Sequence, residues 1–547
     1  MGMWRWGRTV ALIVGVALGG VAGAAEVAKS TAQPAVKPVN VETCYGCHGP
    51  IKEFHAGSKH KNVNCTACHN KLDEHLADAS KRPVTRVDLA ACGTCHQQQF
   101  QSFQGMNWNK TARFEKSQLI GPSPNPAWDK LMMPHGFTKE HNLPRSHSFA
   151  LLDQLLVDRS FGGRFAYKDG WKGLTLNGDL KIWDVLVDQY PGQDHKPFKP
   201  GTAAAANPVC LSCKTQDHIL DWAYMGDPVQ GAKWSRASKV NEMVMSVNHS
   251  LNCFFCHDPH SAKPRIVRDG LIQALTRPQA DTLWHKDPKA TKIDVKDLGV
   301  RGFTRKIALL EKVDSKLMCA QCHVEYNCNP GIDPTTGQPI GMADQRTNHF
   351  PLKDVFGITK HYDDLKFRDF RHALTGALLW KAQHPDVETF WNSKHDKAGV
   401  SCQDCHMPKV KDAKTGKIYT SHWQTNPRNY VKETCLRCHN NWNETKAKYV
   451  MDSTNAHIQG KMRKAEFWLV QLVDKFGEAN TAGVDEKALA DARRKHDEAH
   501  AHWEWWTAAN GAAFHNTDQA KESLNRSMVL SQEGIKILDD AIKAKRS

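Results

Sequence analysis

The chain has 547 residues, of which 40% are hydrophobic and 24% are charged, a composition typical of globular proteins. Its formal charge of +15 is spread along the sequence without a long block of basic residues, and this argues against a nucleic-acid partner. Of the 17 cysteines, all but Cys328 fall into C-x-x-C pairs with one spacing, which excludes an ordinary disulfide framework.

Residues 1–25 have the pattern of an export signal. Arg5 and Arg8 precede a short apolar run that ends in small residues around Ala24 and Ala25. An uncleaved anchor is the alternative, but the run is too short to span a bilayer. Later segments are also too polar to span one, so we expect a cleaved, periplasmic protein without a membrane span in the mature chain.

Eight cysteine pairs share one spacing, and seven of them are followed directly by histidine. Two thiols one helical turn apart can add to the two vinyl groups of a haem, and the adjacent histidine can bind its iron. A zinc knuckle or a redox disulfide is the alternative for a single pair, but seven repeats in an exported chain favour covalent haem c. We therefore expect eight haem c groups. The motifs are Cys44-Tyr-Gly-Cys47-His48, Cys65-Thr-Ala-Cys68-His69, Cys92-Gly-Thr-Cys95-His96, Cys210-Leu-Ser-Cys213-Lys214, Cys253-Phe-Phe-Cys256-His257, Cys319-Ala-Gln-Cys322-His323, Cys402-Gln-Asp-Cys405-His406 and Cys435-Leu-Arg-Cys438-His439.

A haem that only carries electrons takes a second protein ligand, because a six-coordinate iron changes little when it gains or loses an electron. Ser-Lys-His precedes two of the motifs and ends at His60 and His395, which we predict to be distal ligands of neighbouring haems rather than of the haem that follows each in sequence. For the first three haems we also choose His75 and His249. The next candidates are His55, His135 and His141.

The fourth motif ends in Lys214 instead of histidine. An amine binds iron only when it is neutral, so a ligating lysine needs a pKa that the metal and burial drive far down. Electron transfer does not require such a ligand. We therefore interpret Lys214 as the proximal ligand of a reaction-centre haem whose other face is open. The alternative is that Lys214 is not a ligand and that a histidine elsewhere in the chain binds the iron of this haem.

Strand-like alternation is scarce, so we predict a mainly α fold with little β structure, a haem-packed core and a C-terminal bundle of long helices. The predicted regions are 26–130 with three haems, a five-haem catalytic core at 131–440 and the bundle at 441–547. Such helices can also build oligomer contacts, and we expect a homo-oligomer. Apolar residues recur at helical spacing in two stretches of the bundle, at Ala465, Leu469, Leu472, Val473 and Phe476, and at Leu524, Met528, Ile535, Leu538 and Ile542.

Several segments together resemble the ammonia-forming cytochrome c nitrite reductases. They are the lysine-ending motif, Cys319-Ala-Gln-Cys-His-Val-Glu-Tyr326, Lys381-Ala-Gln-His384-Pro and Cys402-Gln-Asp-Cys-His-Met-Pro-Lys409. The pentahaem members correspond to residues from about 140 onward. The three added motifs between 44 and 96, and the sequence Tyr326-Asn-Cys328, are similar to the octahaem nitrite reductases. The resemblance covers nearly the whole mature chain.

The resemblance implies which residues form the reaction centre. The segment around His147 matches one that supplies a distal haem histidine and then the active-site arginine, which makes His147 a ligand and Arg159 catalytic, with Arg145 as the less favoured arginine. Tyr326 and His384 complete the expected pocket. A fixed charge, a phenol and an imidazole suit a small anion that must be protonated. Taken singly, Arg159 could instead bind a haem propionate and His384 could be a core histidine.

The resemblance also implies two further distal haem ligands, His422 and His515. In the octahaem family, a tyrosine and a cysteine in this Tyr-x-Cys arrangement are joined by a thioether. We therefore predict a cross-link between Tyr326 and Cys328, which should make the phenol more acidic and fix its orientation. A buried free thiol is the alternative for Cys328.

A structural calcium site next to the active haem is implied as well. Its donors are the side chains of Glu325 and Gln383 and the backbone carbonyls of Tyr326 and Lys381. Oxygen atoms from two loops suit this hard cation.

The activity that the resemblance implies is reduction of nitrite to ammonium, which consumes six electrons and eight protons, with hydroxylamine as a second substrate. The electrons would come from a redox protein or a quinol-linked donor. Octahaem hydroxylamine oxidoreductases are one alternative, but their active haem keeps a histidine-type motif where this chain has Lys214. A non-catalytic electron-transfer cytochrome is the other alternative, and it predicts protein ligands on both faces of all eight irons.

Overall fold

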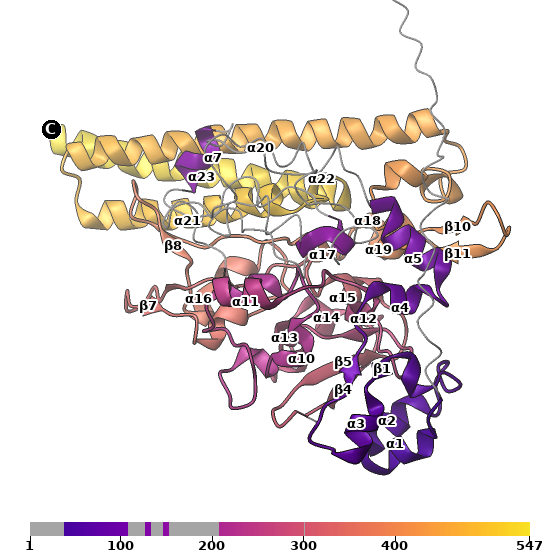
Figure 1. Ribbon diagram of the computed structural model, residues 1–547. Coiled ribbons are helices and arrows are strands. Elements are labelled where there is room, and N and C mark those ends of the chain that lie inside the picture. Colours follow the sequence, from indigo (N-terminus) through magenta and orange to yellow (C-terminus); the bar gives the residue numbers. More distant parts are fainter. Residues whose placement is uncertain (1–37, 108–125, 133–145, 152–206, 300) are drawn as a thin grey trace, which may run out of the picture. The chain divides into compact units, whose positions relative to one another are not determined.

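The computed structural model describes residues 38–107, 126–132, 146–151, 207–299 and 301–547. The expected export signal at 1–25 and the expected catalytic Arg159 lie outside these ranges. Pro38–Ser547 form one unit by their contacts. Helices predominate in it and the strands are short (Figure 1), which confirms the predicted mainly α fold class. The division at 130 and 440 stays a prediction.

Short capped helices carry many of the cysteine pairs. The Asn207 side chain begins α9 (Pro208–Leu211) by accepting a hydrogen bond from Val209 N–H at 3.0 Å. Asn252 begins α12 (Cys253–Cys256) in the same way. Capping satisfies backbone donors that would otherwise lack a partner at the helix start. Residues three apart lie on one face of a helical turn, which suits the attachment of both thiols of a pair to one group.

The other short helices lie along the chain. They are α1 (Val41–Cys47), α2 (Gly49–His55), α3 (Leu72–Ala77), α4 (Leu89–Gly93), α5 (Gln97–Phe103), α7 (Pro126–Leu131), α10 (His218–Asp221), α11 (Val240–Ser246), α13 (Asp269–Thr276), α14 (Leu283–Lys286), α15 (Ser315–Cys319), α16 (Ile358–Leu365), α17 (Asp386–Phe390), α18 (Lys394–Lys397) and α19 (Cys402–His406). Of these, α1, α4, α15 and α19 also carry motif cysteines.

One antiparallel sheet of three strands, in the order β3-β5-β4, lies in the middle of the described chain, and its register pairs Arg265 with Leu309 and Ile293 with Leu310. Its strands are β3 (Arg265–Ile266), β4 (Ile293–Asp297) and β5 (Lys306–Leu310). The other strands form antiparallel pairs, which are β1 (His69–Asn70) with β2 (Val84–Thr85), β6 (Gly331–Ile332) with β7 (Pro339–Ile340), β8 (Phe370–Arg371) with β9 (Leu378–Leu379) and β10 (Lys409–Lys411) with β11 (Ile418–Thr420).

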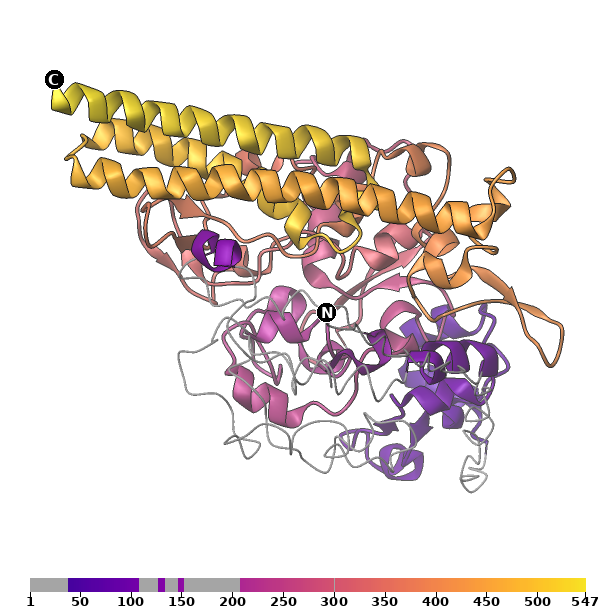
Figure 2. The same ribbon diagram turned by 90° about the horizontal axis from the view of Figure 1, so that it is seen from above.

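Three long helices end the chain: α20 (Glu444–Thr481), α21 (Glu486–Ala508) and α23 (Thr517–Arg546). They lie side by side in both ribbon views (Figures 1 and 2), and α20 leads into α21 through Gly483, whose φ of 66° suits a residue without a side chain. The predicted apolar residues of α20 are all buried. Those of α23 are buried or packed against the buried core. The predicted long-helix bundle is present.

A buried ion pair joins this bundle to the preceding part of the chain. Lys381 Nζ lies 3.2 Å from Glu504 Oε1, and neither side chain is exposed to solvent. Glu504 Oε2 also lies 3.0 Å from Nε2 of His500. The short helix α22 (Ala512–His515) follows α21 and carries His515 back toward α17. The packing of the bundle and this buried ion pair therefore help to position His515, which the sequence predicts to be a haem ligand.

Candidate functional site

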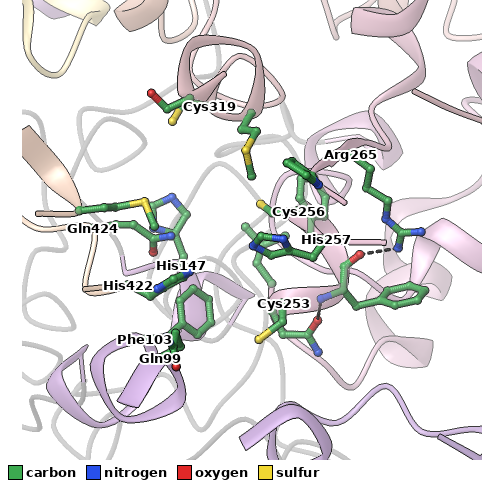
Figure 3. Close-up of a pocket in the computed structure, with 18 of the residues that line it drawn as sticks. Gln99, Phe103, His147, Cys253, Cys256, His257, Arg265, Cys319, His422 and Gln424 are labelled. Carbon is green, nitrogen blue, oxygen red and sulfur yellow. Dashed lines mark hydrogen bonds between the residues drawn. The ribbon is translucent and has the colours of Figure 1, made fainter. Parts of the chain in front are cut away.

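A large cavity of about 2600 Å³ collects the predicted attachment residues. Fifteen of the sixteen paired cysteines and all seven motif histidines line it, and the exception is Cys210. Figure 3 shows part of this cavity, with Cys253, Cys256 and His257 on one wall and His422 on another. The described chain therefore leaves a connected space beside nearly every motif.

Each of the seven motif histidines has a second histidine ring close to it. A histidine nitrogen lies about 2 Å from a bound first-row metal ion, so two rings that bind one ion from opposite sides have centroids roughly 6 Å apart. The centroid distances in the seven pairs lie between 5.9 and 6.5 Å. The pairs, with the motif histidine first, are His48–His75, His69–His260, His96–His60, His257–His422, His323–His147, His406–His515 and His439–His395.

Hydrogen bonds at Nδ1 orient several of these rings. A ligating histidine usually donates its second ring N–H to a carbonyl or carboxylate oxygen, and this directs the other nitrogen to the metal. In this chain Nδ1 of five paired histidines donates to a backbone carbonyl, in His60 to Pro259 at 2.8 Å, in His75 to Lys81 at 2.8 Å, in His406 to Thr425 at 2.9 Å, in His422 to Thr420 at 2.9 Å and in His515 to Asp386 at 3.2 Å.

The protonation state of these rings also suits metal binding. Burial lowers the pKa of His257, His260 and His515 to about 4. Burial, with the neighbouring His323 and Lys214, lowers the pKa of His147 to about 3. These imidazoles are neutral near pH 7, as metal ligation requires.

A histidine pair outside the motifs shows a different geometry. Nε2 of His349 lies 2.8 Å from Nε2 of His361, with ring centroids 5.1 Å apart. This separation is that of a direct hydrogen bond and leaves no room for a metal ion between the rings. The spacing of this pair therefore differs from that of the motif pairs, although His496 and His500, also outside the motifs, have centroids 6.0 Å apart.

The sequence predicts His249 as a distal ligand, but the structure places it outside the large cavity. Its Nδ1 lies 2.8 Å from Oδ1 of Asp217, beside a smaller cavity of about 330 Å³. His260 instead lies opposite His69, with ring planes inclined by 13°. We therefore correct the expected ligand from His249 to His260. The sequence feature that could have indicated His260 as a ligand is its position three residues after the motif histidine His257.

The other candidates for the first three haems have different outcomes. Both ring nitrogens of His55 are engaged, Nδ1 with the Tyr45 hydroxyl at 2.6 Å and Nε2 with the Val63 carbonyl at 3.1 Å. His55 therefore has a structural role. His135 and His141 lie outside the described residues.

Lys214 lines the large cavity, and its backbone differs from that of the histidine motifs. Its N–H donates to the Leu211 carbonyl at 2.8 Å. In the motif at His323, the corresponding N–H donates to the first cysteine, Cys319, at 2.9 Å. The lysine-ending motif therefore differs from the motif at His323 in its turn geometry as well as in its ligand atom.

Tyr326 lies beside the lysine-ending motif. It is 4% exposed, and its phenol interacts electrostatically with the thiol of Cys213. Its ring stacks on Phe350 with centroids 5.4 Å apart. Asn207, the cap of α9, also donates its side-chain amide to the carbonyl of Cys328. The helix that leads to Lys214 and the segment of Tyr326 are thus fixed together.

His384 reaches the same region from another segment and lines the large cavity. The neighbouring Gln383 N–H donates to Oε2 of Glu325 at 2.7 Å. Farther along, Val387 N–H donates to the His323 carbonyl at 2.9 Å. The two segments that carry the predicted tyrosine and histidine therefore lie against each other.

The residues predicted to bind calcium form a buried set of oxygen donors. Glu325 is fully buried, and its Oε1 accepts a hydrogen bond from the Tyr362 hydroxyl at 2.8 Å. Burial raises the pKa of Glu325 well above its usual value, because no hydrogen bond fully replaces the lost hydration of the charged form. The side-chain oxygen of Gln383 is buried without a hydrogen-bond partner among the described residues. These donors fit a hard cation, which backbone carbonyls of Tyr326 and Lys381 would help to coordinate.

Cys328, the unpaired cysteine, is fully buried. Its Sγ lies 3.9 Å from Sγ of Cys210, the first cysteine of the lysine-ending motif. The thiol is therefore next to the proposed reaction centre, and its cross-link to Tyr326 stays a prediction.

Thiols of different motifs lie close enough to interact electrostatically, and these pairs indicate which motifs are neighbours in space. Cys322 interacts with Cys213, so the motif at 319–323 adjoins the lysine-ending motif. The same motif adjoins the next one through Cys319 and Cys402. The other pairs are Cys65 with Cys44 and Cys92 with Cys253. The motif at 92–96 therefore adjoins the motif at 253–257, and the motif at 319–323 adjoins both the lysine-ending motif and the motif at 402–406.

Known proteins resemble this chain in sequence. A cytochrome c-552 of Haemophilus influenzae is 29% identical over 419 residues, covering 74% of this chain and 65% of that protein. The cytochrome c nitrite reductase subunit NrfA of Nitratidesulfovibrio vulgaris is 26% identical over 461 residues, covering 78% of this chain and 72% of that protein. The match with the Haemophilus protein thus spans less than two thirds of its length.

A solved structure shares the fold. The cytochrome c nitrite reductase of Desulfovibrio desulfuricans gives a TM-score of 0.57 at 22% identity and covers 83% of this chain and 86% of that chain. The family described as cytochrome c552 matches residues 185–545, a stretch that includes the lysine-ending motif and the C-terminal helices. The chain belongs to the cytochrome c552 family.

Proposed function

We propose that the protein is an octahaem nitrite reductase that converts nitrite to ammonium. The observation that carries the proposal is the contrast between seven motif histidines, each paired with a second histidine at about 6 Å, and the one motif that ends in Lys214. Similarity to the nitrite reductase NrfA supports the same activity. When bound, the haem groups would store electrons, and the one at Lys214 would offer substrate an open coordination position.

The chain's own residues would bind and protonate the substrate. Arg159 supplies a fixed positive charge for the nitrite anion, Tyr326 donates a proton from its phenol, and His384 holds a proton on its imidazole. Hydrogen bonding between Gln383 and Glu325 supports this arrangement, because it holds the segments of Tyr326 and His384 together. Reduction by six electrons passes through partly reduced nitrogen species before ammonium is released, so hydroxylamine is a second substrate of the proposed site.

Calcium at Glu325, Tyr326, Lys381 and Gln383 would neutralise the buried carboxylate. The solved structure of the Desulfovibrio desulfuricans enzyme, in which calcium sites are described, supports this assignment. The cation would hold the two segments of the pocket in place, since it takes donors from both.

Electrons would enter from a redox protein or a quinol-linked donor. The electrostatic interactions of Cys92 with Cys253 and of Cys322 with Cys213 place these motifs near one another, which supports a route through the N-terminal haems to the lysine-ending motif. We also propose export to the periplasm, on the pattern of residues 1–25. In the described residues, no helix has the length and apolar character that crossing a bilayer requires.

A homo-oligomer is part of the proposal. Tyr449 and Phe467 of α20 are 69% and 56% exposed, and Val529 of α23 is 51% exposed. Large apolar side chains on the outer surface of the bundle suit contact between copies of the chain.

An assay with reduced viologen tests the activity. The haem-loaded protein should consume nitrite and release ammonium, and it should reduce hydroxylamine as well, with sulfite as the third anion compared. Nitrite should also shift the spectrum of a high-spin haem. Consumption of sulfite without nitrite would refute the substrate, whereas a spectrum that nitrite leaves unchanged would favour a pure electron-transfer cytochrome.

A further inference from the structure

Arg268 is a fully buried cation beside the proposed reaction centre. Its side chain is 1% exposed, and it immediately precedes α13. The guanidinium carbon lies 5.8 Å from the ring centroid of Tyr326 and 5.3 Å from that of Phe350. Its Nε and Nη2 have no hydrogen-bond partner among the described residues. A buried charge with so little compensation is costly, which argues that it has a purpose beyond packing.

The backbone ties Arg268 to two neighbouring motifs. Gln321, which lies between Cys319 and Cys322, accepts the N–H of Arg268 at 3.4 Å through its side-chain oxygen. The carbonyl of Gln321 accepts the thiol of Cys213 at 3.9 Å. Cys213 and Cys322 also interact electrostatically with the guanidinium. Arg268 therefore sits where the lysine-ending motif meets the motif at 319–323.

Other charged groups near Arg268 do not cancel its charge by direct pairing. The neighbouring Asp269 is used elsewhere, because Oδ2 accepts Trp222 Nε1–H at 2.8 Å and Oδ1 accepts Asn348 Nδ2–H at 3.0 Å. Its carboxylate offsets part of the field only through space. Burial and the charge of Arg268 lower the pKa of His218 to about 4, so this imidazole is neutral.

We propose that Arg268 tunes reduction potential: its buried charge raises the potentials of the haems attached at Cys210–Cys213 and at Cys319–Cys322, so that electrons gather next to Lys214. This inference rests on haem attachment at these two motifs, as proposed above. In this proposal Arg268 acts on the two haems through its charge and makes no contact with substrate.

The sign follows from Coulomb's law. Each one-electron step takes a ferric iron to the ferrous state with an electron from an external donor and breaks no bond, so the local charge falls by one unit. A fixed positive charge nearby favours the more negative product, and the effect is largest where water is excluded. Removing the charge should therefore lower the potential, and removing the nearby negative charge should raise it.

The test is a spectroelectrochemical titration of the haem-loaded protein, which follows the high-spin signal expected at Lys214. Arg268→Gln should lower the midpoint of this signal, and Arg268→Lys, which keeps the charge, should shift it less. Asp269→Asn should raise the midpoint. The matched control is Arg236→Gln, since Arg236 is also 1% exposed but pairs with Asp227 at 2.8 Å, and it should leave the midpoint in place.

The outcomes separate cleanly. An unchanged midpoint in Arg268→Gln with all haems bound would overturn the proposal, as would an equal drop in Arg236→Gln. If Arg268→Gln fails to fold, the Asp269→Asn variant tests the proposal instead. An unchanged or lower midpoint in Asp269→Asn would count against the tuning role. Absence of any high-spin signal in the unmodified protein would instead refute the proposed reaction centre.

Discussion

The imidazole rings of His69 and His260 lie with centroids 6.3 Å apart and planes inclined by 13°. His69 belongs to the N-terminal motifs, whereas His260 follows the motif at 253–257. A metal ion bound between them would therefore join the N-terminal region to the rest of the chain. Three further pairs also link distant segments, namely His257 with His422, His323 with His147 and His406 with His515.

Replacing His260 by alanine should remove the second axial ligand of one haem. We expect one additional high-spin signal by electron paramagnetic resonance, with haem attachment retained because the cysteines are unchanged. His249→Ala is the matched control, since His249 pairs with Asp217, and it should leave the low-spin signals intact. The reverse pattern would restore His249 as the ligand.

Replacing Lys214 by histidine should keep the haem attached but change its reaction. Changing a residue that only supports a metal ligand typically costs roughly 10–100-fold in activity or affinity, so we expect replacement of the ligand itself to lower nitrite turnover by at least about that factor. Turnover with reduced viologen and haem content by pyridine haemochrome are the measurements. The exposed Lys417→His serves as control. Full activity in Lys214→His would place the reaction centre at another motif.

Chelating calcium should destabilise the unmodified protein but not a variant that lacks the buried carboxylate. Glu325→Gln removes the charge that the cation would neutralise, so its melting temperature should be low and insensitive to added calcium. In the unmodified chain, chelator should cost on the order of 1–3 kcal/mol, as expected when buried donors lose their partner. The exposed Glu522→Gln should respond to calcium like the unmodified chain. Equal calcium responses in all three proteins would argue against this site.

The pH dependence of stability should include a contribution from Asp281. Burial opposes its charge, but hydrogen bonds from Lys353 and Arg277 outweigh burial and hold its pKa below the usual range. The ionised form therefore stabilises the fold above the unfolded pKa of about 3.9, and this stabilisation is lost as pH falls through the lower folded pKa. Asp281→Asn should cost up to about 1 kcal/mol near pH 7 and progressively less in acid.

Urea titrations at several pH values measure this effect. The carboxylate of Asp364 is 65% exposed and pairs only with Lys360, so Asp364→Asn is the control and should change stability little at any pH. A cost for Asp281→Asn that is independent of pH would show that packing, rather than charge, explains it. Arg277 also donates to the Phe350 carbonyl at 3.0 Å, so this cluster supports the ring that stacks on Tyr326.

Peptide mapping should detect the proposed thioether. A peptide that spans Tyr326 and Cys328 should weigh less than its sequence by two hydrogen atoms and should resist alkylation at Cys328. Cys328→Ser provides the uncross-linked reference, with a less acidic phenol expected at Tyr326. Recovery of an unmodified peptide with an alkylatable thiol would refute the cross-link.

Local chemistry made much of the site predictable from sequence. Haem attachment needs two cysteines at a fixed spacing and an iron ligand directly after them. The attachment residues therefore form a short motif that can be recognised in the sequence. The helices of the bundle were predictable for a similar reason, because Leu469, Val473 and Phe476 recur with the period of a buried helical stripe.

Distal ligands were harder to predict because they depend on how distant segments approach one another. His249 and His260 are equally ordinary in sequence, and only the folded chain shows Asp217 holding one while the other faces His69. The role of Arg268 could not be predicted for the same reason. It depends on burial where two motifs meet, and no local sequence pattern indicates such a position.

The proximity of thiols from different motifs has a consequence for how the protein is made. In the folded chain Cys92 interacts electrostatically with Cys253, and Cys319 with Cys402. In the proposed oxidising compartment, neighbouring free thiols can join as disulfides, and each such bond would disable two motifs at once. We therefore expect haem attachment at each motif to precede the folding step that brings its spatial neighbour close.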